Sequence, residues 1–244
     1  MKKIILLSCV IFSLCFVCKV FGEPLFHISP STDGPGLYEV EAFEKNLTCD
    51  QLREALSPTG ELGPIAERIC SLSFFYCGKL EALPDLSSLT SLEYVWLDRC
   101  AALKDIAALF ALRTMKVLDI HDCPNVRHLQ LIGLSKFGYL GIGTDVNLET
   151  LILQNLPSLR SIELFLTENL RIFAFLYLPS LRWGYIYGMD SLKFYSPENA
   201  PKENTFEGKP VCIFRSSGDT DTVMNPFVKA ILGGSGSISI SRLA

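Results

Sequence analysis

Hydrophobic residues in the middle of the chain follow a spacing that fits neither an amphipathic helix nor a simple alternating strand. The pattern is L-x-x-L-x-L-x-x-C, with Ile, Val, Met or Phe in place of some leucines, and it occupies residues 69–77, 92–100 and 115–123. Each copy begins 23 residues after the previous one. Three copies in phase indicate a structural repeat.

The segments between the copies also repeat. Cys77 and Cys100 are each followed by apolar residues at every third position, as far as Leu89 and Leu112. Alternate side chains of a strand share a face, so the L-x-L pair of each copy would point into a common interior. The cysteine would turn the chain, and the looser segment would return it to the start of the next coil. One such coil cannot bury its own leucines, whereas stacked coils share a continuous core, so the pattern predicts a solenoid.

After the third copy the repeat tightens to 11 residues. The shorter units begin at Val126, Phe137, Leu148, Leu159, Leu170 and Leu181. Both halves of each coil then resemble strands, which leaves two assignments open for the concave face. Continuation of the earlier phase places concave strands at 140–142, 162–164 and 184–186. The other phase uses 151–153 and 173–175, and we favour the continuous phase.

The two patterns together resemble the leucine-rich repeat family, whose signature is L-x-x-L-x-L-x-x-N/C-x-L at intervals of roughly 20–29 residues. The resemblance covers residues 69–195, about half of the chain. It implies an α/β-type solenoid with short parallel strands on the concave side. It also implies an irregular or partly strand-like convex side and a helical amino-terminal cap. The alternative phase, with its L-P-S-L segments, resembles the irregular repeats of plant resistance proteins.

The residues on either side of the repeats differ from them in composition and in hydrophobic spacing. Residues 23–68 contain Thr48-Cys-Asp-Gln51, a capping box that predicts a short helix, and we interpret them as a lead-in and cap. Residues 196–244 begin with a polar linker that contains Pro and Asn, and we interpret them as a carboxy-terminal flank. Within this flank we expect a strand at 211–214 and an edge strand at the end of the chain.

The first 22 residues have a third pattern. Met1-Lys2-Lys3 is followed by an unbroken apolar run over residues 4–18, and small residues precede a candidate cleavage site near Gly22. This organisation is typical of a secretory signal peptide, and the run is shorter than the roughly 20 residues that span a bilayer. We therefore expect a secreted, periplasmic or extracellular chain without a membrane span, with an uncleaved anchor as the alternative. Cleavage would change the formal charge from -4 to -7, which argues against nucleic acid and anionic membranes as partners.

Cleavage would leave six cysteines in the mature chain. The resemblance to extracellular leucine-rich-repeat proteins with cysteine-stapled caps makes Cys49 and Cys70 a candidate disulfide. Cys77, Cys100 and Cys123 occupy the turn position of the repeat. We interpret them as small buried side chains with weak hydrogen-bonding capacity.

Two groups of residues raise the question of catalysis or metal binding. Asp219-Thr-Asp-Thr-Val223 resembles the nucleophile loop of haloacid-dehalogenase-type phosphatases, but it does not directly follow a strand, and too little chain follows it for a catalytic domain. The second group has good metal-ligand types and comprises Asp119, His121, Asp122, Cys123 and His128. In a coil, Asp119 and His121 would face the concave side while Cys123 faces the interior. We expect no enzyme, and neither a metal nor a cofactor.

Aromatic and acidic residues alternate with the core residues on the predicted concave strands. Tyr and Trp supply a large contact area with a polar handle, which suits a protein-binding surface. We therefore expect a protein or peptide partner with basic regions, with glycan or cell-wall binding as the alternative and the oligomeric state left open. The predicted partner-binding residues are Phe75, Tyr94, Trp96, Asp98, Asp119, His121, Tyr139, Glu163, Phe165 and Tyr185. Trp183 and Tyr187 share this face, and packing under the flank is the alternative for them.

Overall fold

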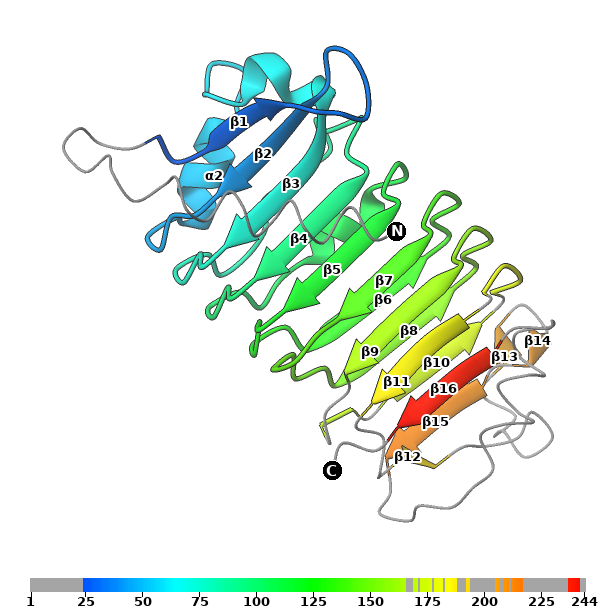
Figure 1. Ribbon diagram of the computed structural model, residues 1–244. Coiled ribbons are helices and arrows are strands. Elements are labelled where there is room, and N and C mark those ends of the chain that lie inside the picture. The colour runs from blue at the N-terminus through cyan, green and yellow to red at the C-terminus, as the bar shows by residue number, and fades with distance from the viewer. Residues whose placement is uncertain are drawn as a thin grey trace.

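The computed structural model of the protein is a solenoid of mainly parallel strands (Figure 1). It describes residues 24–165, 169–170, 172–176, 178–181, 183–187, 192–193, 205–206, 209–210, 212–216 and 237–241. The predicted signal peptide and the Asp219-Thr-Asp-Thr-Val223 segment lie outside these residues. Within the described part of the chain, no helix is long and apolar enough to cross a membrane.

One long sheet runs the length of the solenoid in the order β1-β2-β3-β4-β5-β7-β9-β11-β16. Its strands are β1 (His27–Pro30), β2 (Tyr38–Ala42), β3 (Ile69–Phe75), β4 (Tyr94–Asp98), β5 (Val117–His121), β7 (Tyr139–Ile142), β9 (Ser161–Phe165), β11 (Trp183–Tyr187) and β16 (Ser237–Ser241). β1 and β2 pair antiparallel, and every later pair is parallel. The long sheet therefore extends beyond the predicted repeats at both ends, because β2 adds to β3 and β16 adds to β11.

A second sheet lies behind the carboxy-terminal half of the long one, in the order β12-β15-β10-β8-β6 (Figure 1). Its strands are β6 (His128–Ile132), β8 (Thr150–Gln154), β10 (Ile172–Leu176), β12 (Leu192–Lys193) and β15 (Cys212–Ser216). A separate two-stranded sheet joins β13 (Thr205–Phe206) to β14 (Lys209–Pro210). β15 confirms the strand predicted at 211–214, and β16, at the end of the long sheet, confirms the edge strand predicted at the end of the chain.

The two sheets answer the question of phase. The continuous phase is confirmed as the long sheet, where Leu118 of β5 pairs with Leu140 of β7, and Leu140 pairs with Ile162 of β9. The alternative set of strands is also present, since β6, β8 and β10 form the second sheet. In the earlier coils the return segment contains 3₁₀-helices instead, η1 (Gly63–Arg68) and η2 (Ala107–Ala111). The 11-residue unit is thus half a coil with one strand in each sheet.

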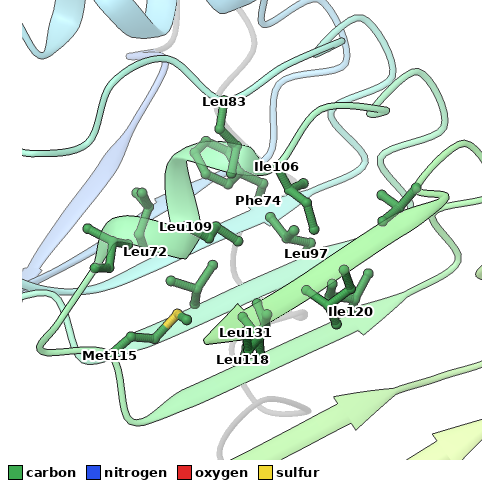
Figure 2. Close-up of a cluster of buried hydrophobic side chains, with 14 of the residues drawn as sticks. Leu72, Phe74, Leu83, Leu97, Ile106, Leu109, Met115, Leu118, Ile120 and Leu131 are labelled. Atoms are coloured by element: carbon green, nitrogen blue, oxygen red, sulfur yellow. The ribbon is translucent and has the colours of Figure 1, made fainter. Parts of the chain in front are cut away.

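The repeated hydrophobic positions form one continuous core, as predicted (Figure 2). On β4 and β5 the burial alternates residue by residue, with the leucine positions inside. Every L-x-x-L-x-L position of the three long copies is at most 1% exposed: Ile69, Leu72, Phe74, Leu92, Val95, Leu97, Met115, Leu118 and Ile120. Leu109 of η2 closes the far side of the same core.

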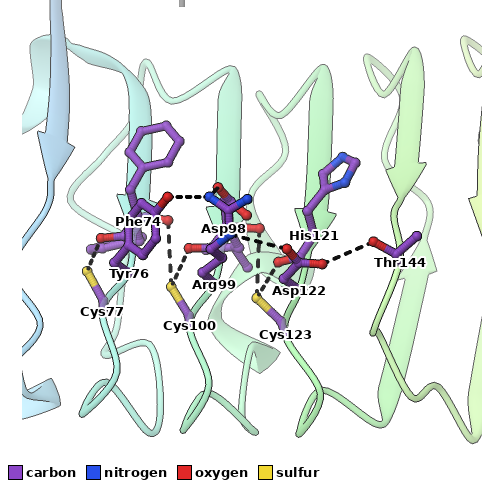
Figure 3. Close-up of polar contacts among 12 residues, drawn as sticks. Phe74, Tyr76, Cys77, Asp98, Arg99, Cys100, His121, Asp122, Cys123 and Thr144 are labelled. Carbon is purple, nitrogen blue, oxygen red and sulfur yellow. Dashed lines mark hydrogen bonds and ion pairs between the residues drawn. The ribbon is translucent and has the colours of Figure 1, made fainter. Parts of the chain in front are cut away.

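The turn cysteines Cys77, Cys100 and Cys123 are fully buried, as predicted. Each thiol lies within hydrogen-bonding distance of a carbonyl oxygen of the preceding coil, at Sγ–O distances of 3.6 Å to Ala42, 3.6 Å to Phe74 and 3.8 Å to Leu97 respectively. Figure 3 shows the contact between Cys100 and Phe74. Each thiol also lies within reach of a carbonyl oxygen two residues before it, at 3.6 Å for Phe75, 3.6 Å for Asp98 and 3.1 Å for His121. The buried thiols thus have acceptors both in their own coil and in the preceding one.

The helix α2 (Cys49–Ala55) confirms the predicted capping box. Thr48 Oγ1 accepts a hydrogen bond from the backbone N–H of Gln51, and Gln51 Oε1 accepts one from the backbone N–H of Thr48. The helix buries Leu52 against the core. Cys49 and Cys70 are both free thiols in this structure, where Cys70 Sγ donates to the carbonyl oxygen of Tyr38 at 3.4 Å, so the candidate disulfide is not formed.

Candidate interaction face

The open face is the outward side of the long sheet, made of the residues that alternate with the core positions from β2 to β9. Its small residues Ser71, Ser73, Gly141, Gly143 and Ser161 are buried among their neighbours. Strand register aligns these side chains in three rows. The first row comprises Glu39, Ser71, Tyr94, Val117, Tyr139 and Ser161. The middle row comprises Glu41, Ser73, Trp96, Asp119, Gly141 and Glu163. The third row comprises Phe75, Asp98, His121, Gly143 and Phe165.

Two stacked pairs of aromatic rings lie on the open face. Tyr94 and Trp96 of β4 are half-buried and nearly parallel, with ring centroids 5.8 Å apart and 6° between their planes. Phe43, just after β2, stacks on Phe75 of β3 with centroids 4.9 Å apart. Each pair holds two rings in a fixed orientation, which presents a large contact area at little cost in side-chain entropy.

A histidine–carboxylate pair lies at the centre of the open face. Asp119 Oδ1 and His121 Nε2, both on β5, are 2.8 Å apart. The hydrogen bond to Asp119 raises the pKa of His121, while partial burial of the imidazole opposes this shift. The pair leans over two glycines of the next coil: a Cβ on Gly141 would lie 2.2 Å from Asp119 Oδ1, and one on Gly143 would lie 1.8 Å from His121 Nδ1. Any side chain at these two positions would displace the pair.

Carboxylates on either side of this pair make the open face acidic. Asp98 lies beside His121 in the third row, and burial raises its pKa in spite of the nearby Arg99 guanidinium. On the other side, burial and the charges of Asp119 and Glu163 raise the pKa of the Tyr139 phenol, so this hydroxyl stays protonated at neutral pH.

A ridge of turn residues borders the third row. Tyr76, Arg99, Asp122 and Asp145 recur at 23-residue spacing, and each has a positive φ, between 48° and 59°. The guanidinium of Arg99 stacks over the ring of Tyr76 and donates to its hydroxyl, and Arg99 Nε is 3.3 Å from Asp122 Oδ2 (Figure 3). The hydrogen bond from Thr144 Oγ1 to Asp122 Oδ1, at 3.1 Å, extends the ridge by one coil. These contacts join four coils along one edge of the open face.

The structure brings nine of the ten predicted partner-binding residues together on the open face. They are Phe75, Tyr94, Trp96, Asp98, Asp119, His121, Tyr139, Glu163 and Phe165. The backbone of Tyr185 is in register with Glu163, but its side chain lies outside the described residues, as do those of Trp183 and Tyr187.

The candidate metal ligands are not brought together. Cys123 is buried in the core, and His128 lies on β6 in the other sheet, whereas Asp119 and His121 are on the open face. In the described part of the chain, no group of three or more His, Cys, Asp or Glu residues could hold a metal ion.

Sequence reasoning missed two contributors to the open face. Glu39 and Glu41 come from β2, which lies ahead of the first repeat copy and lacks its signature. The alternation in Tyr-Glu-Val-Glu-Ala at 38–42 was the available signal. Gly141 and Gly143 were the second omission, because the repeat pattern constrains only the buried positions.

The fold and site define the class of molecule as a parallel-strand solenoid with an open aromatic and acidic sheet face. No protein-family model matches the chain, and no curated protein matches it significantly.

Proposed function

We propose that this chain is an exported protein-interaction module of the leucine-rich-repeat type. It binds a protein or peptide partner through the open face. The observation that carries the proposal is the stacked Tyr94–Trp96 pair, whose tryptophan is in register with Asp119, on strands whose other side packs into the core. Aromatic anchors held by a rigid scaffold and flanked by charge are characteristic of protein-binding surfaces.

Charge indicates the chemistry of the partner. Glu39, Glu41, Asp98, Asp119 and Glu163 all belong to the open face. Burial raises the pKa of Glu41 as well as that of Asp98, so both carboxylates are charged at some cost to the folded chain. A basic partner would offset this cost on binding, and we therefore propose a partner with lysine or arginine at its contact surface.

Two further observations support the leucine-rich-repeat assignment. The three long copies repeat every 23 residues with their leucines inside, and a buried cysteine follows the strand in each of them. The cysteine thiol bonds to the preceding coil, which is the role that the N/C position of the repeat signature requires. Export is supported by residues 1–22, whose composition is that of a signal peptide.

The experiment is affinity capture with residues 23–244. Wild type is compared with a Tyr94→Ala/Trp96→Ala double variant in extracts of the source organism and of its host, if it has one. Gln130→Ala/Ile132→Ala is the matched control, since both residues are exposed on β6 in the other sheet. Any protein captured is identified, purified and tested again by calorimetry. Binding that survives in the control and is lost in the double variant supports the open face as the site.

Two other results would redirect the proposal. Equal binding by all three proteins would move the site away from the open face. The Tyr94–Trp96 stack also matches the aromatic platforms on which sugars bind, so glycan or cell-wall binding is the second candidate function. Retention of the wild type, but not of the double variant, on protein-free polysaccharide would favour that candidate.

A further inference from the structure

His121 occupies a position from which one proton can change the charge of the open face. It lies in the third row, next to Asp98 of β4, and shares a 2.8 Å hydrogen bond with Asp119 of the middle row. Its side chain is 47% exposed, so a proton can reach it from solvent. Histidine is the side chain whose charge ordinarily changes between pH 5 and 8.

The groups that face His121 from every neighbouring element are mostly acidic. They are Asp98 on β4, Asp119 on β5 and Asp122 in the following turn. Farther along the sheet, Tyr139 on β7 and Glu163 on β9 add to the acidic surroundings of Asp119. Arg99 is the nearby cation, and it is paired with Asp98 at 3.5 Å and Asp122 at 3.3 Å. A second histidine, His27 of β1, lies at the far end of the sheet, 3.8 Å from Glu41.

We propose that His121 acts as a charge switch, whose protonation on acidification weakens the binding of a basic partner to the open face. This inference rests on the proposed function. With a neutral imidazole, Asp119 presents an uncompensated negative charge in the middle row. With an imidazolium, the same carboxylate is neutralised and held by a charge-assisted hydrogen bond. A lysine or arginine of the partner is then no longer attracted by the neutralised Asp119 and is repelled by the His121 imidazolium.

Gly141 and Gly143 are what make the switch effective. Because neither glycine carries a side chain, Asp119 and His121 lie flat against the next coil and stay in contact with each other. A methyl group on Gly141 would come within 2.2 Å of Asp119 Oδ1, so alanine there forces the carboxylate away from the imidazole. Gly141→Ala therefore uncouples the pair without changing any titratable residue.

The first test measures the switch without a partner. The chain has three histidines, so proton NMR can follow each imidazole individually, with His121→Gln and His27→Gln identifying two of the signals. We expect the pKa of His121 to lie above its ordinary value, and to fall towards that value in Asp119→Asn and in Gly141→Ala. A His121 imidazole that does not change its protonation between pH 8 and pH 5.5 would overturn the proposal.

The second test measures binding with a hexa-arginine peptide as the probe, because its charge is constant over the range. Hexa-citrulline is the neutral control of nearly equal shape. The chain contains two tryptophans, so in a Trp183→Phe background Trp96 fluorescence reports on the open face. We expect the peptide to bind about tenfold more weakly at pH 5.5 than at pH 8, and this ratio to fall to about two or less in His121→Gln. His128→Gln, an exposed site on β6 in the other sheet, and Glu54→Gln, an exposed site on α2, should retain the wild-type ratio.

The outcomes separate the switch from the function on which it rests. Binding with the same pH ratio in wild type and His121→Gln overturns the switch and leaves the basic-partner proposal standing. Equal binding of hexa-arginine and hexa-citrulline, or no binding of hexa-arginine at either pH, overturns both. A pH ratio lost in His121→Gln, but kept in the two controls, establishes the switch.

Discussion

Replacement of Leu118 by alanine tests the inward and outward sides of the solenoid strands most directly. Leu118 is fully buried on β5 between Val95 of β4 and Leu140 of β7. The substitution removes three buried carbons at about 0.8 kcal/mol each, or roughly 2.4 kcal/mol of transfer free energy. The cavity that remains adds to this, so we expect the free energy of unfolding to fall by about 3–5 kcal/mol.

The control is Val117→Ala, one residue earlier on the same strand. Val117 faces outward and is half-buried, so we expect a loss of less than about 1 kcal/mol. Urea denaturation followed by circular dichroism measures both losses, and the denaturant slope m shows whether the solenoid still unfolds as one unit. In a thermal scan, Leu118→Ala should lower Tm by about 6–20 °C. Equal losses for the two variants would mean that β5 does not place Leu118 inside, and the register of the long sheet would be wrong.

Four further results are expected. Thr48→Ala should lower the free energy of unfolding by about 1 kcal/mol in urea denaturation, because the helix loses its cap, whereas Thr48→Ser should retain it. Asp145 is exposed with φ +52°, so Asp145→Gly should match wild type or raise Tm, while Asp145→Val should cost about 1–2 kcal/mol. The hydrogen bond to Asp119 raises the pKa of His121 in the folded chain above its value of about 6.5 in the unfolded chain. The pair therefore stabilises the fold fully below about pH 6.5, and this stabilisation is lost as the pH rises through the folded-state pKa of His121. Asp119→Asn should thus lower the free energy of unfolding more at pH 6 than at pH 9. The turn cysteines should resist a thiol reagent until urea unfolds the chain, and fast reaction in the native state would contradict their burial.

The positions that the repeat constrains were predictable from the sequence. The period alone identifies Val95, Leu118 and Cys100 as core residues, because an inward position in a stacked coil must carry an apolar or small side chain. The same reasoning identified Tyr94 and Trp96 as outward residues, since side chains of a strand alternate. The cap of α2 was predictable because Thr48 and Gln51 act within one turn of helix.

Two features could not be predicted from this pattern. Continuation of the earlier phase predicted the strands of the long sheet, but an 11-residue unit repeated twice per coil is the same from either starting point, so the pattern presents the two sets of strands as alternatives. The structure uses both sets and places them on opposite sides of the core. The open face depends on contacts between coils, such as Asp119 over Gly141, and these residues are separated by a full turn of the chain.

The sequence by itself determined the period, the buried positions and the acidic and aromatic character of the outward ones, because these follow from the burial of apolar side chains in a strand-and-turn coil. Only the tertiary structure decided which outward residues meet. Stacking aligned Glu41 of β2 with Trp96 and Asp119, and laid His121 against Gly143. The physical reason is that register between coils is set by the whole core, whereas a sequence pattern describes one coil at a time.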